Sequence, residues 1–334
     1  MLQSIKAATK TINRQLHTKN VYKSVMKAAQ ITEWNTTPKY TDIPTPPAPG
    51  PDEEQIKVIA AGIHRLVRGR ATGQHFSAKT LPHILGSDGV GTRTSDGQLV
   101  YFSTFWEKGS MAELVNVAKT DITPITTPNL DPVRVAGLVN PSMASWMALK
   151  ARVFNPPEGF SCLVLGATST SGAVALSLAK HLGAGTIMGC ARNEQAMKDL
   201  GYDVAIPLKD KVEDTDFTPA QDVDVILDFL YGPVVPHLFR SLKPTTPVQY
   251  VEIGSLVTGT MELPGDLLRA KDITVRGAAP GSYSGAAMAK EMPSLIAATG
   301  KLESQKFKIV KLEDIESAWG DMKSRIIVQV SEYP

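Results

Sequence analysis

The sequence predicts an α/β fold in which a doubly wound parallel sheet is joined to a β-rich unit. Residues 26–148 contain short apolar strands with period-two alternation, separated by Pro and Gly, as in partly barrel-like all-β units. From 160 to 283 apolar strands alternate with helical stretches, which favours right-handed crossovers and a parallel sheet buried on both faces. A length of 334 residues is sufficient for two such units.

The β-rich unit is clearest in the segment EQIKVIAAG, where Ile56, Val58 and Ala60 recur at every second position. A turn at 155–159 follows it. Six strands are then expected in the parallel sheet, the number typical of a dinucleotide-binding sheet. These strands span 162–165, 186–190, 204–206, 223–228, 248–253 and 273–278.

The C-terminal tail contains a helix at 286–299, the strand FKIV, a helix at 312–322 and the strand IIVQV. These elements are too few to fold alone, so we expect them to return to the β-rich unit. The predicted organisation is therefore a basic extension (1–25), a β-rich domain (26–147 and 284–334) and a parallel-sheet domain (148–283).

The first 25 residues carry five Lys or Arg and no acid, and place four Leu and Ile side chains near one helical face. This pattern is typical of a mitochondrial transit peptide. A solvated tail, or a start codon assigned ahead of a domain that begins at Met26, is the alternative. Because the apolar core of a secretory signal is missing, we expect the protein in the cytoplasm or the mitochondrial matrix.

The composition excludes several classes of protein. Hydrophobic residues make up 43% and charged residues 20%, without an apolar run of about 18 residues, so the chain is neither disordered nor membrane-spanning. Without the extension the formal charge of +2 becomes −3, which gives no electrostatic basis for binding nucleic acid. The two cysteines, Cys162 and Cys190, lie in apolar strands, so neither a disulfide framework nor a structural zinc site is expected.

The segment SCLVLGATSTSGAVALSLAKHLGA predicts a buried strand, a turn of small residues and a helix. Small residues let a pyrophosphate approach the N–H groups at the helix N-terminus, where the helix dipole favours negative charge. The strict GxGxxG pattern fails, because Thr168 and Ser171 replace two glycines. We expect a nucleotide site here rather than a purely structural turn. Its residues are Gly166, Ala167, Thr168, Ser169, Thr170, Ser171 and Gly172.

The residues after the second parallel strand favour NADPH over NADH. A site for NAD usually has an acid about 20 residues past the glycine turn, where it binds the ribose hydroxyls. This chain has Arg192 and Asn193 at that distance, and neither Asp nor Glu between Gly172 and Arg192. A guanidinium there would attract a 2′-phosphate. The alternative is a solvated arginine at the start of a helix.

These motifs resemble the medium-chain dehydrogenase/reductase superfamily, in its zinc-independent quinone oxidoreductase-like branch, which includes enone and enoyl reductases. The resemblance covers about residues 26–334 and rests on MKAAQITEW, KVIAAGIHRLVRG, LPHILGSDGVG, GSMAELVNV, the glycine turn, DVDVILDFLYGP and LRAKDITVRGAAPGS. It implies a chaperonin-10-like (GroES-like) domain, a Rossmann domain that binds NADPH, and a substrate cleft between them. It also adds Gly254 and Ser255, in YVEIGS, to the cofactor residues, and implies a homodimer through the edge strand ITVRGA.

The zinc enzymes of this superfamily bind their catalytic metal through a Cys, a His and a third ligand. The resemblance places His64 at the Cys position, and Ser87 and Asp88 at positions usually filled by His and Glu. One histidine cannot hold a Lewis-acidic zinc with an open coordination position, so no catalytic metal is expected. A carbonyl substrate would then be polarised by hydrogen bonds.

The resemblance implies three candidate catalytic residues near the nicotinamide, namely His64, Trp146 and Tyr231. His64 would lie beside the nicotinamide ribose, with a structural histidine as the alternative. Tyr231 follows the carboxyl end of a strand, where ligands of such sheets bind. For Trp146 core packing is an equal alternative. Three arginines close to His64 are either solvated, or bind a cofactor phosphate or an acidic substrate. They are Arg65, Arg68 and Arg70.

The expected activity is NADPH-dependent hydride transfer to a quinone or to the activated C=C bond of an α,β-unsaturated carbonyl compound. Hydride addition at the β-carbon gives an enolate, which needs a proton from a side chain or water. A zinc-free alcohol dehydrogenase and an enoyl-thioester reductase are alternatives on the same fold. An alternative of another class is an NADPH-binding protein with a regulatory, structural or RNA-binding task.

Overall fold

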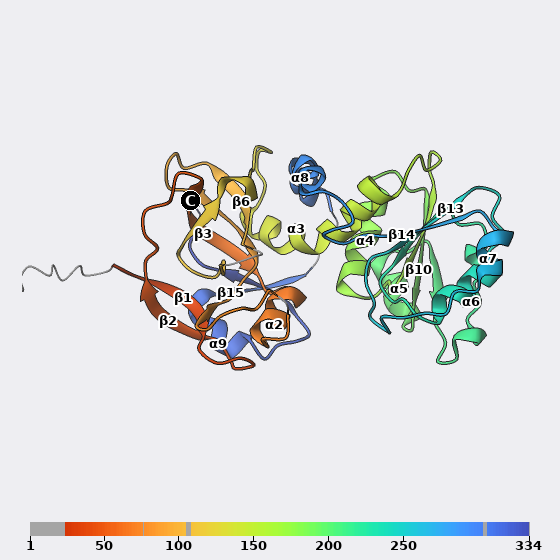
Figure 1. The fold of residues 1–334 in the computed structure, drawn as a ribbon, viewed down its shortest axis with the longest axis horizontal. Helices are drawn as coiled ribbons and strands as arrows, with labels where there is room; N and C mark the ends of the chain where they lie inside the picture. The colour runs from red at the N-terminus through yellow and green to blue at the C-terminus, as the bar shows by residue number, and fades with distance from the viewer. Residues whose placement is uncertain (1–23, 76, 105–107, 303–305, 334) are drawn as a thin grey trace, which may run out of the picture.

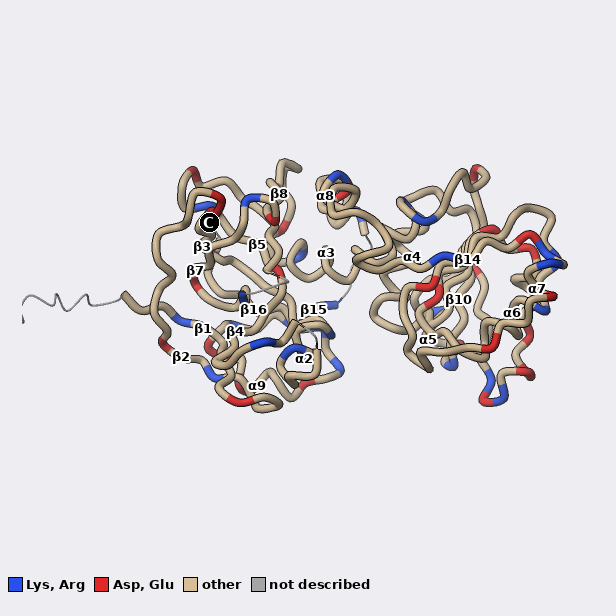
Figure 2. Tube along the Cα trace, in the orientation of Figure 1, with Lys and Arg blue, Asp and Glu red and all other residues tan. Residues whose placement is uncertain are grey.

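The chain forms two lobes that lie side by side along the long axis of the molecule (Figure 1). The computed structural model describes residues 24–75, 77–104, 108–302 and 306–333. The first lobe contains a three-stranded and a seven-stranded sheet, and the second lobe contains a six-stranded sheet. Basic and acidic residues are spread over both lobes (Figure 2). The predicted N-terminal extension lies outside the described residues up to residue 23.

The sheets of the first lobe are mainly antiparallel. The small sheet has the order β2-β1-β4, and the large sheet has the order β15-β16-β3-β5-β6-β8, with β7 also pairing with β3. In β3, Ile56 and Val58 are buried on either side of the exposed Lys57, as their alternation predicts. The strands before residue 125 are β1 (Val25–Ile31), β2 (Lys39–Pro44), β3 (Glu53–Gly62), β4 (His83–Ile84), β5 (Asp88–Arg93), β6 (Leu99–Ser103), β7 (Leu114–Ala118) and β8 (Ile122–Pro124). Helix α2 (Arg65–Ala71) follows β3.

The C-terminal strands complete the large sheet of the first lobe. Strand β15 (Phe307–Lys311) runs parallel to β16 (Arg325–Gln329), which pairs in antiparallel fashion with β3. The helix predicted at 312–322 is shorter than expected, because only a 3-10 turn and α9 (Ile315–Ala318) form. Asp321 accepts hydrogen bonds from the N–H groups of Lys323 and Ser324, which favours a turn at that point.

The second lobe is built on one parallel sheet of the order β11-β10-β9-β12-β13-β14. In β9, Leu163 and Leu165 pack on one face, and Cys162 and Val164 pack on the other. Both faces are therefore buried, and the strand order is that of a Rossmann sheet, which confirms the predicted fold class. The strands are β9 (Ser161–Leu165), β10 (Thr186–Ala191), β11 (Val204–Pro207), β12 (Val225–Asp228), β13 (Val248–Glu252) and β14 (Ile273–Gly277). The helices are α4 (Thr170–His181), α5 (Glu194–Leu200), α6 (Val234–Ser241) and α7 (Gly265–Ala270).

Helix α3 (Pro132–Met147) connects the lobes. The Asp131 carboxylate caps its N-terminus by accepting a 2.9 Å hydrogen bond from the N–H of Val133. The helix continues into the second lobe as a π-helical turn, Ala148–Arg152. Apolar side chains of α3, α4 and α8 (Gly285–Thr299) join residues of β3 and β16 in one buried cluster. The lobes therefore share a continuous core where these three helices meet (Figure 1).

Two further properties of the described residues bear on the sequence predictions. Both thiols, Cys162 and Cys190, are free and buried, and burial raises the pKa of each to about 12. These cysteines are therefore unreactive core residues. Among the described helices, none combines the length and the apolar character that a membrane span requires.

Candidate cofactor and active site

The turn of small residues lies between β9 and α4, as predicted. Gly166 adopts a left-handed conformation with φ +86°, which glycine tolerates at no steric cost. A Cβ at Gly172 would lie 2.4 Å from the carbonyl oxygen of Gly166, so only glycine allows the helix to start this close to the strand. The Ser169 hydroxyl caps α4 by accepting a 3.0 Å hydrogen bond from the N–H of Gly172. Thr168 and Thr170 are exposed, so the first turn of α4 is accessible to an anion.

The other predicted cofactor residues lie along the same edge of the sheet. Arg192 directly follows β10, and Gly254 and Ser255 follow β13. Because all six strands are parallel, their carboxyl ends share one edge, where the strand order reverses between β9 and β12. The fold therefore brings the predicted cofactor residues together.

Two cations lie at the corner of the sheet after β10 and β11. Arg192 is exposed, and it forms no ion pair with an acid among the described residues. Asn193 caps α5 by accepting a 3.0 Å hydrogen bond from Ala196 N–H. A hydrogen bond from Lys198, and the more distant charge of Lys209, lower the pKa of Glu194. Lys209 is exposed and lies two residues after β11. The sequence analysis did not predict it as a cofactor residue, although its position just after the third parallel strand could have indicated that role.

Tyr231 lies in a strained turn at the carboxyl end of β12. Its φ of +58° is left-handed, which is unfavourable for a bulky residue. The buried Asp228 carboxylate holds this turn by accepting hydrogen bonds from the N–H groups of Leu230 (2.7 Å) and Tyr231 (3.1 Å). The Tyr250 hydroxyl donates a third, at 2.6 Å. Burial raises the pKa of Asp228 to about 6 although these donors oppose the shift. Sequence reasoning missed the role of Asp228.

His64 and Asp88 meet inside the first lobe. His64 Nε2 lies 3.6 Å from Asp88 Oδ2, and the two side chains are 8% and 1% exposed. Asp88 Oδ1 accepts hydrogen bonds from Ser87 Oγ (2.7 Å) and Asn140 Nδ2 (3.1 Å), and Oδ2 accepts one from Tyr101 OH (3.0 Å). His64 Nε2 has no hydrogen-bond partner within the described chain. His64, Ser87 and Asp88, which the sequence analysis compared with a zinc ligand set, therefore lie together in one buried polar cluster.

Metal binding at this cluster is not favoured by its donors. Ser87 uses its hydroxyl proton to bind the Asp88 carboxylate, so the cluster offers one imidazole and one carboxylate. Within the described ranges, three or more His, Cys, Asp or Glu side chains do not converge anywhere as a metal-binding group. Burial, followed by the charge of Asp88, raises the pKa of the Tyr101 hydroxyl well above its usual value, so Tyr101 stays a hydrogen-bond donor.

Trp146 lies in the core between α3, α4 and α8, where its side chain packs rather than facing solvent. It is 3% exposed, and its ring stacks on His181 with 6.2 Å between ring centroids. Its indole N–H donates a 3.0 Å hydrogen bond to Glu291. The described contacts do not join His64 to Tyr231 or Trp146, which lie in other parts of the fold.

The three arginines near His64 have different environments. Arg68 donates hydrogen bonds to the carbonyl groups of Trp319 (2.7 Å) and Asp321 (2.8 Å), so it stabilises the contact of α2 with the tail. Arg70 is buried, and only Arg65 is exposed. The solvated alternative therefore does not hold for Arg70, and Arg68 binds backbone carbonyl groups of the tail.

A fourth arginine links the lobes at the glycine turn. Arg325, at the start of β16, donates a long 3.5 Å hydrogen bond to the carbonyl oxygen of Thr170 in the first turn of α4. Burial lowers the pKa of Arg325 to about 10, which leaves it charged at neutral pH. Sequence reasoning missed this residue, because nothing near it in the chain indicates that it reaches the second lobe.

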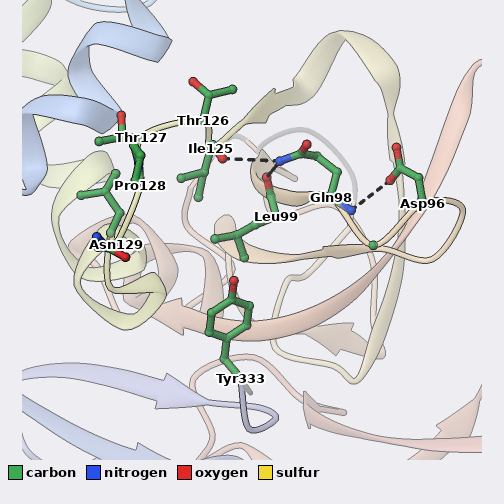
Figure 3. A pocket seen from close by; sticks show the side chains of 11 residues that line it. Asp96, Gln98, Leu99, Ile125, Thr126, Thr127, Pro128, Asn129 and Tyr333 are labelled. Carbon is green, nitrogen blue, oxygen red and sulfur yellow. Dashed lines mark hydrogen bonds between the residues drawn. The ribbon is translucent and has the colours of Figure 1, made fainter.

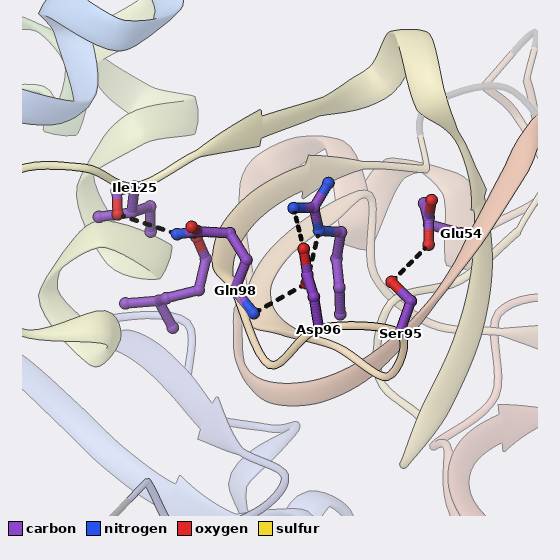
Figure 4. A network of polar contacts seen from close by, with 7 residues as sticks. Glu54, Ser95, Asp96, Gln98 and Ile125 are labelled. Atoms are coloured by element: carbon purple, nitrogen blue, oxygen red, sulfur yellow. Dashed lines mark hydrogen bonds and ion pairs between the residues drawn. The ribbon is translucent and has the colours of Figure 1, made fainter.

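A surface pocket of about 610 Å³ lies in the first lobe, apart from all predicted site residues (Figure 3). The β5–β6 hairpin, the segment 125–130 and Tyr333 line it. Two of its lining residues bind each other, because Gln98 N–H donates to Asp96 at 3.0 Å. Beside the pocket, Ser95 of the same hairpin donates to Glu54 at 3.0 Å (Figure 4). These contacts stabilise the hairpin turn, and none of the predicted site residues lines this pocket.

Comparison with known proteins places the chain in a family. No protein-family model matches it. A protein of Emericella nidulans named a probable NADPH-dependent quinone reductase is 32% identical over 360 aligned positions, which cover 91% of this chain and 99% of that protein. The chain belongs to the medium-chain dehydrogenase/reductase superfamily. The resemblance seen in the sequence is therefore confirmed.

Solved structures of this superfamily share the fold. A mycobacterial quinone oxidoreductase superposes with a TM-score of 0.75 at 18% identity, covering 91% of this chain and all of that one. A thermostable alcohol dehydrogenase from Pyrobaculum aerophilum superposes with a TM-score of 0.71 at 22% identity, covering 92% of this chain and all of that one. Identities this low support the fold alone, and both quinone and alcohol enzymes of the medium-chain dehydrogenase/reductase superfamily have it.

Proposed function

We propose that this protein is a zinc-independent, NADPH-dependent reductase of a quinone or of the activated C=C bond of an enone. The observation that carries the proposal is the exposed cationic corner of Arg192 and Lys209 at the sheet edge that also holds the glycine turn. Phosphate groups are bound where exposed cations and helix N-terminal N–H groups converge. The name of the Emericella nidulans relative, which states NADPH dependence and quinone reduction, supports it.

The residues at this edge fit the parts of NADPH in the proposal. The first turn of α4 would bind the pyrophosphate, because Gly166 and Gly172 leave no side chain between it and the N–H groups. Arg325 adds a positive charge at the same turn from the first lobe. Arg192 and Lys209 would bind the 2′-phosphate. When bound, NADPH supplies the hydride, so the chain must position it and manage one proton.

His64 and Asp88 are the candidate pair for handling that proton. An N–H on His64 Nε2 would point at the Asp88 carboxylate, which its three donors hold in place. The ring nitrogen Nδ1 is then free to face a reacting group, as in other histidine sites that a carboxylate orients. A Cβ at Gly62 would lie 2.3 Å from the imidazole ring, so glycine makes room for this orientation. In this proposal Asp88 is a positioning residue.

Substitution of the two candidate proton donors tests this assignment. If either residue donates the proton to the enolate, His64→Ala or Tyr231→Phe should lower kcat by roughly 10²-fold with little change in NADPH affinity. Asp88→Asn should alter the pH profile of kcat while leaving NADPH binding in place. Near-normal kcat in both His64→Ala and Tyr231→Phe would make water the proton donor.

A substrate panel separates the proposed activity from its alternatives. We expect NADPH consumption with enones or quinones. Turnover confined to acyl-thioesters would identify an enoyl-thioester reductase, and NADP⁺ reduction with alcohols would identify a zinc-free alcohol dehydrogenase. Tight NADPH binding without turnover of any compound would refute the proposed activity and support a regulatory, structural or RNA-binding task.

Two further proposals concern assembly and location. We propose a homodimer through the outer edge of β14, where Val275 is 41% exposed and the strand has a neighbour on one side only in the described sheet. Light scattering of the purified protein tests it. We also propose that residues 1–25 direct the protein to mitochondria, and import of a reporter carrying these residues tests this.

A further inference from the structure

Arg70 carries a buried positive charge without a described acidic partner. Its side chain is 1% exposed and is among the largest fully buried side chains of the described residues. Its one described hydrogen bond runs from Nη1 to the carbonyl oxygen of Gly86, at 3.2 Å, and its Nε has no partner. Burial lowers the pKa of Arg70, and no described acid counteracts that shift. The Nε–H group of this guanidinium is therefore a buried donor that no described residue uses.

Among the described residues, two histidines lie close enough to Arg70 for its charge to act on them. His83 is 7% exposed, its Nε2 has no described partner, and burial together with the charge of Arg70 lowers its pKa to about 4. Burial, and again the charge of Arg70, lower the pKa of His75. The buried Ser77 hydroxyl lies 2.8 Å from His75 Nδ1. We call Arg70, His75, Ser77 and His83 the Arg70 cluster.

The Arg70 cluster has the chemistry of an anion site. Buried charges in proteins are normally paired, because an unpaired ion loses its hydration without compensation. A carboxylate matches the planar fork of a guanidinium with two parallel hydrogen bonds. It would also accept a hydrogen bond from an imidazole or hydroxyl beside it, and the cluster offers both types. The two buried nitrogens of the cluster without a described partner, Arg70 Nε and His83 Nε2, are therefore of the kind that a carboxylate needs.

The position of the cluster connects it to the proposed reaction. Arg70 lies six residues after His64 along α2, roughly 9 Å by helix rise. Its acceptor Gly86 is two residues from Asp88, which faces His64. The segment 77–82, which joins Ser77 to His83, has no helix or strand and is exposed from 79 to 82. Such segments open more easily than helices or strands.

We propose that Arg70 anchors a binding site for a carboxylate, with His83, His75 and Ser77 as its neighbours. The carboxylate belongs to the reducible substrate or to a free small acid. The first source rests on the proposed reductase function, whereas the site itself does not. The two arms of the experiment separate these cases.

The first arm measures binding without any activity. Acetate is titrated into the full-length protein at constant ionic strength, with chloride as the reference anion, and tryptophan fluorescence is recorded. The Trp34 ring lies 5.8 Å from the His83 ring, so it reports on this cluster. We expect a saturable response to acetate and not to chloride in the wild type. Arg70→Met should weaken this response at least roughly tenfold, the size of a charge-assisted hydrogen bond.

A matched control keeps the first arm specific. Lys79→Met removes one exposed positive charge from the neighbouring segment, and it should leave the acetate response unchanged. Absence of a saturable response in the wild type overturns the proposal, even if Arg70→Met does not fold. An equal loss in Lys79→Met and Arg70→Met overturns it as well, because general electrostatics would then explain the response.

The second arm identifies the source of the carboxylate. NADPH-dependent reduction of 4-phenyl-3-buten-2-one is compared with that of its ring-carboxylated derivative. If the carboxylate belongs to the substrate, the ratio of the two kcat/KM values should fall at least roughly tenfold in Arg70→Met and stay constant in Lys79→Met. A constant ratio together with a positive acetate titration supports the site and assigns it to a free small acid. If the protein has no reductase activity, the proposed function is refuted. The acetate titration of the first arm then decides alone whether the carboxylate site exists.

Discussion

Replacing Arg192 by alanine should remove most of the preference for NADPH over NADH. Arg192 directly follows β10, is exposed and has no described acidic partner, so its charge is available to a ligand. The nearest acid in sequence, Glu194, is bound to Lys198 at 2.6 Å, which limits its repulsion of a phosphate. NADH lacks the 2′-phosphate, so its affinity should be nearly unchanged.

The expected magnitude follows from charge and exposure. A pair of unit charges 4 Å apart interacts by about 1 kcal/mol in water, and a phosphate carries about −1.5 to −2 charges. Salt and side-chain entropy reduce the resulting energy at an exposed site. We therefore expect Arg192 to contribute about 1.4 kcal/mol, or roughly tenfold in affinity. Lys209 should add a smaller contribution, so the variant lacking both cations should bind NADPH and NADH about equally.

Fluorescence titration of both cofactors against each variant provides the measurement. Arg240→Ala serves as the control, because it removes an exposed arginine at the end of α6, outside the residues assigned to the cofactor. Equal affinities for NADPH and NADH in the wild type, or an unchanged ratio in Arg192→Ala, would show that Arg192 is a solvated surface residue.

Three further outcomes are expected. Gly172→Ala should destabilise the protein by about 1–3 kcal/mol, because its Cβ would lie 2.4 Å from the backbone of Gly166. Gly69→Ala is the control, because a Cβ at Gly69 has open space around it. Thermal unfolding compares the two variants, and equal melting temperatures would contradict the packing argument. Burial raises the pKa of Asp228 from 3.8 to about 6, so the folded state keeps a proton that the unfolded state releases. The contribution of Asp228 to the free energy of unfolding should therefore fall by about 2–3 kcal/mol as pH rises from about 4 to 6. Urea unfolding measures this pH dependence, and Asp228→Asn should remove it. If the pH dependence persists in the variant, other groups cause it. Activity should survive metal chelators, and loss of one bound zinc per chain together with activity would refute zinc independence.

The parallel sheet was the most predictable part of the fold. Each of the six predicted strands begins within two residues of its observed start, because strands buried on both faces are continuous apolar runs. The antiparallel sheets could not be predicted in the same detail. Strand β3 pairs with β5, β7 and β16, and no local pattern indicates which distant segments will be its neighbours.

The candidate site was predictable where the chemistry is local. A glycine turn and an arginine after the second strand are visible in the sequence, because single positions there determine what can bind. From the sequence, Arg68 and Arg70 are either solvated or bind a cofactor phosphate or an acidic substrate. Their acceptors in the structure are carbonyl groups at 319, 321 and 86, which only the folded chain brings near. The strained turn of Tyr231 was equally invisible, since it depends on hydrogen bonds to Asp228.

The pairing of β16 with β3 determines the order in which the chain can fold. During synthesis, β9 to β14 emerge as one uninterrupted segment, so the second lobe can be completed while the tail is still unmade. Strand β7 can cover residues 53–57 of β3 early, but residues 60–62 of the same edge must wait until Ile327 arrives to pair with Gly62. An unpaired apolar edge is a template for aggregation. Formation of β16 therefore ends the vulnerable period of this edge, and deletion of Arg325–Gln329 would make that period permanent.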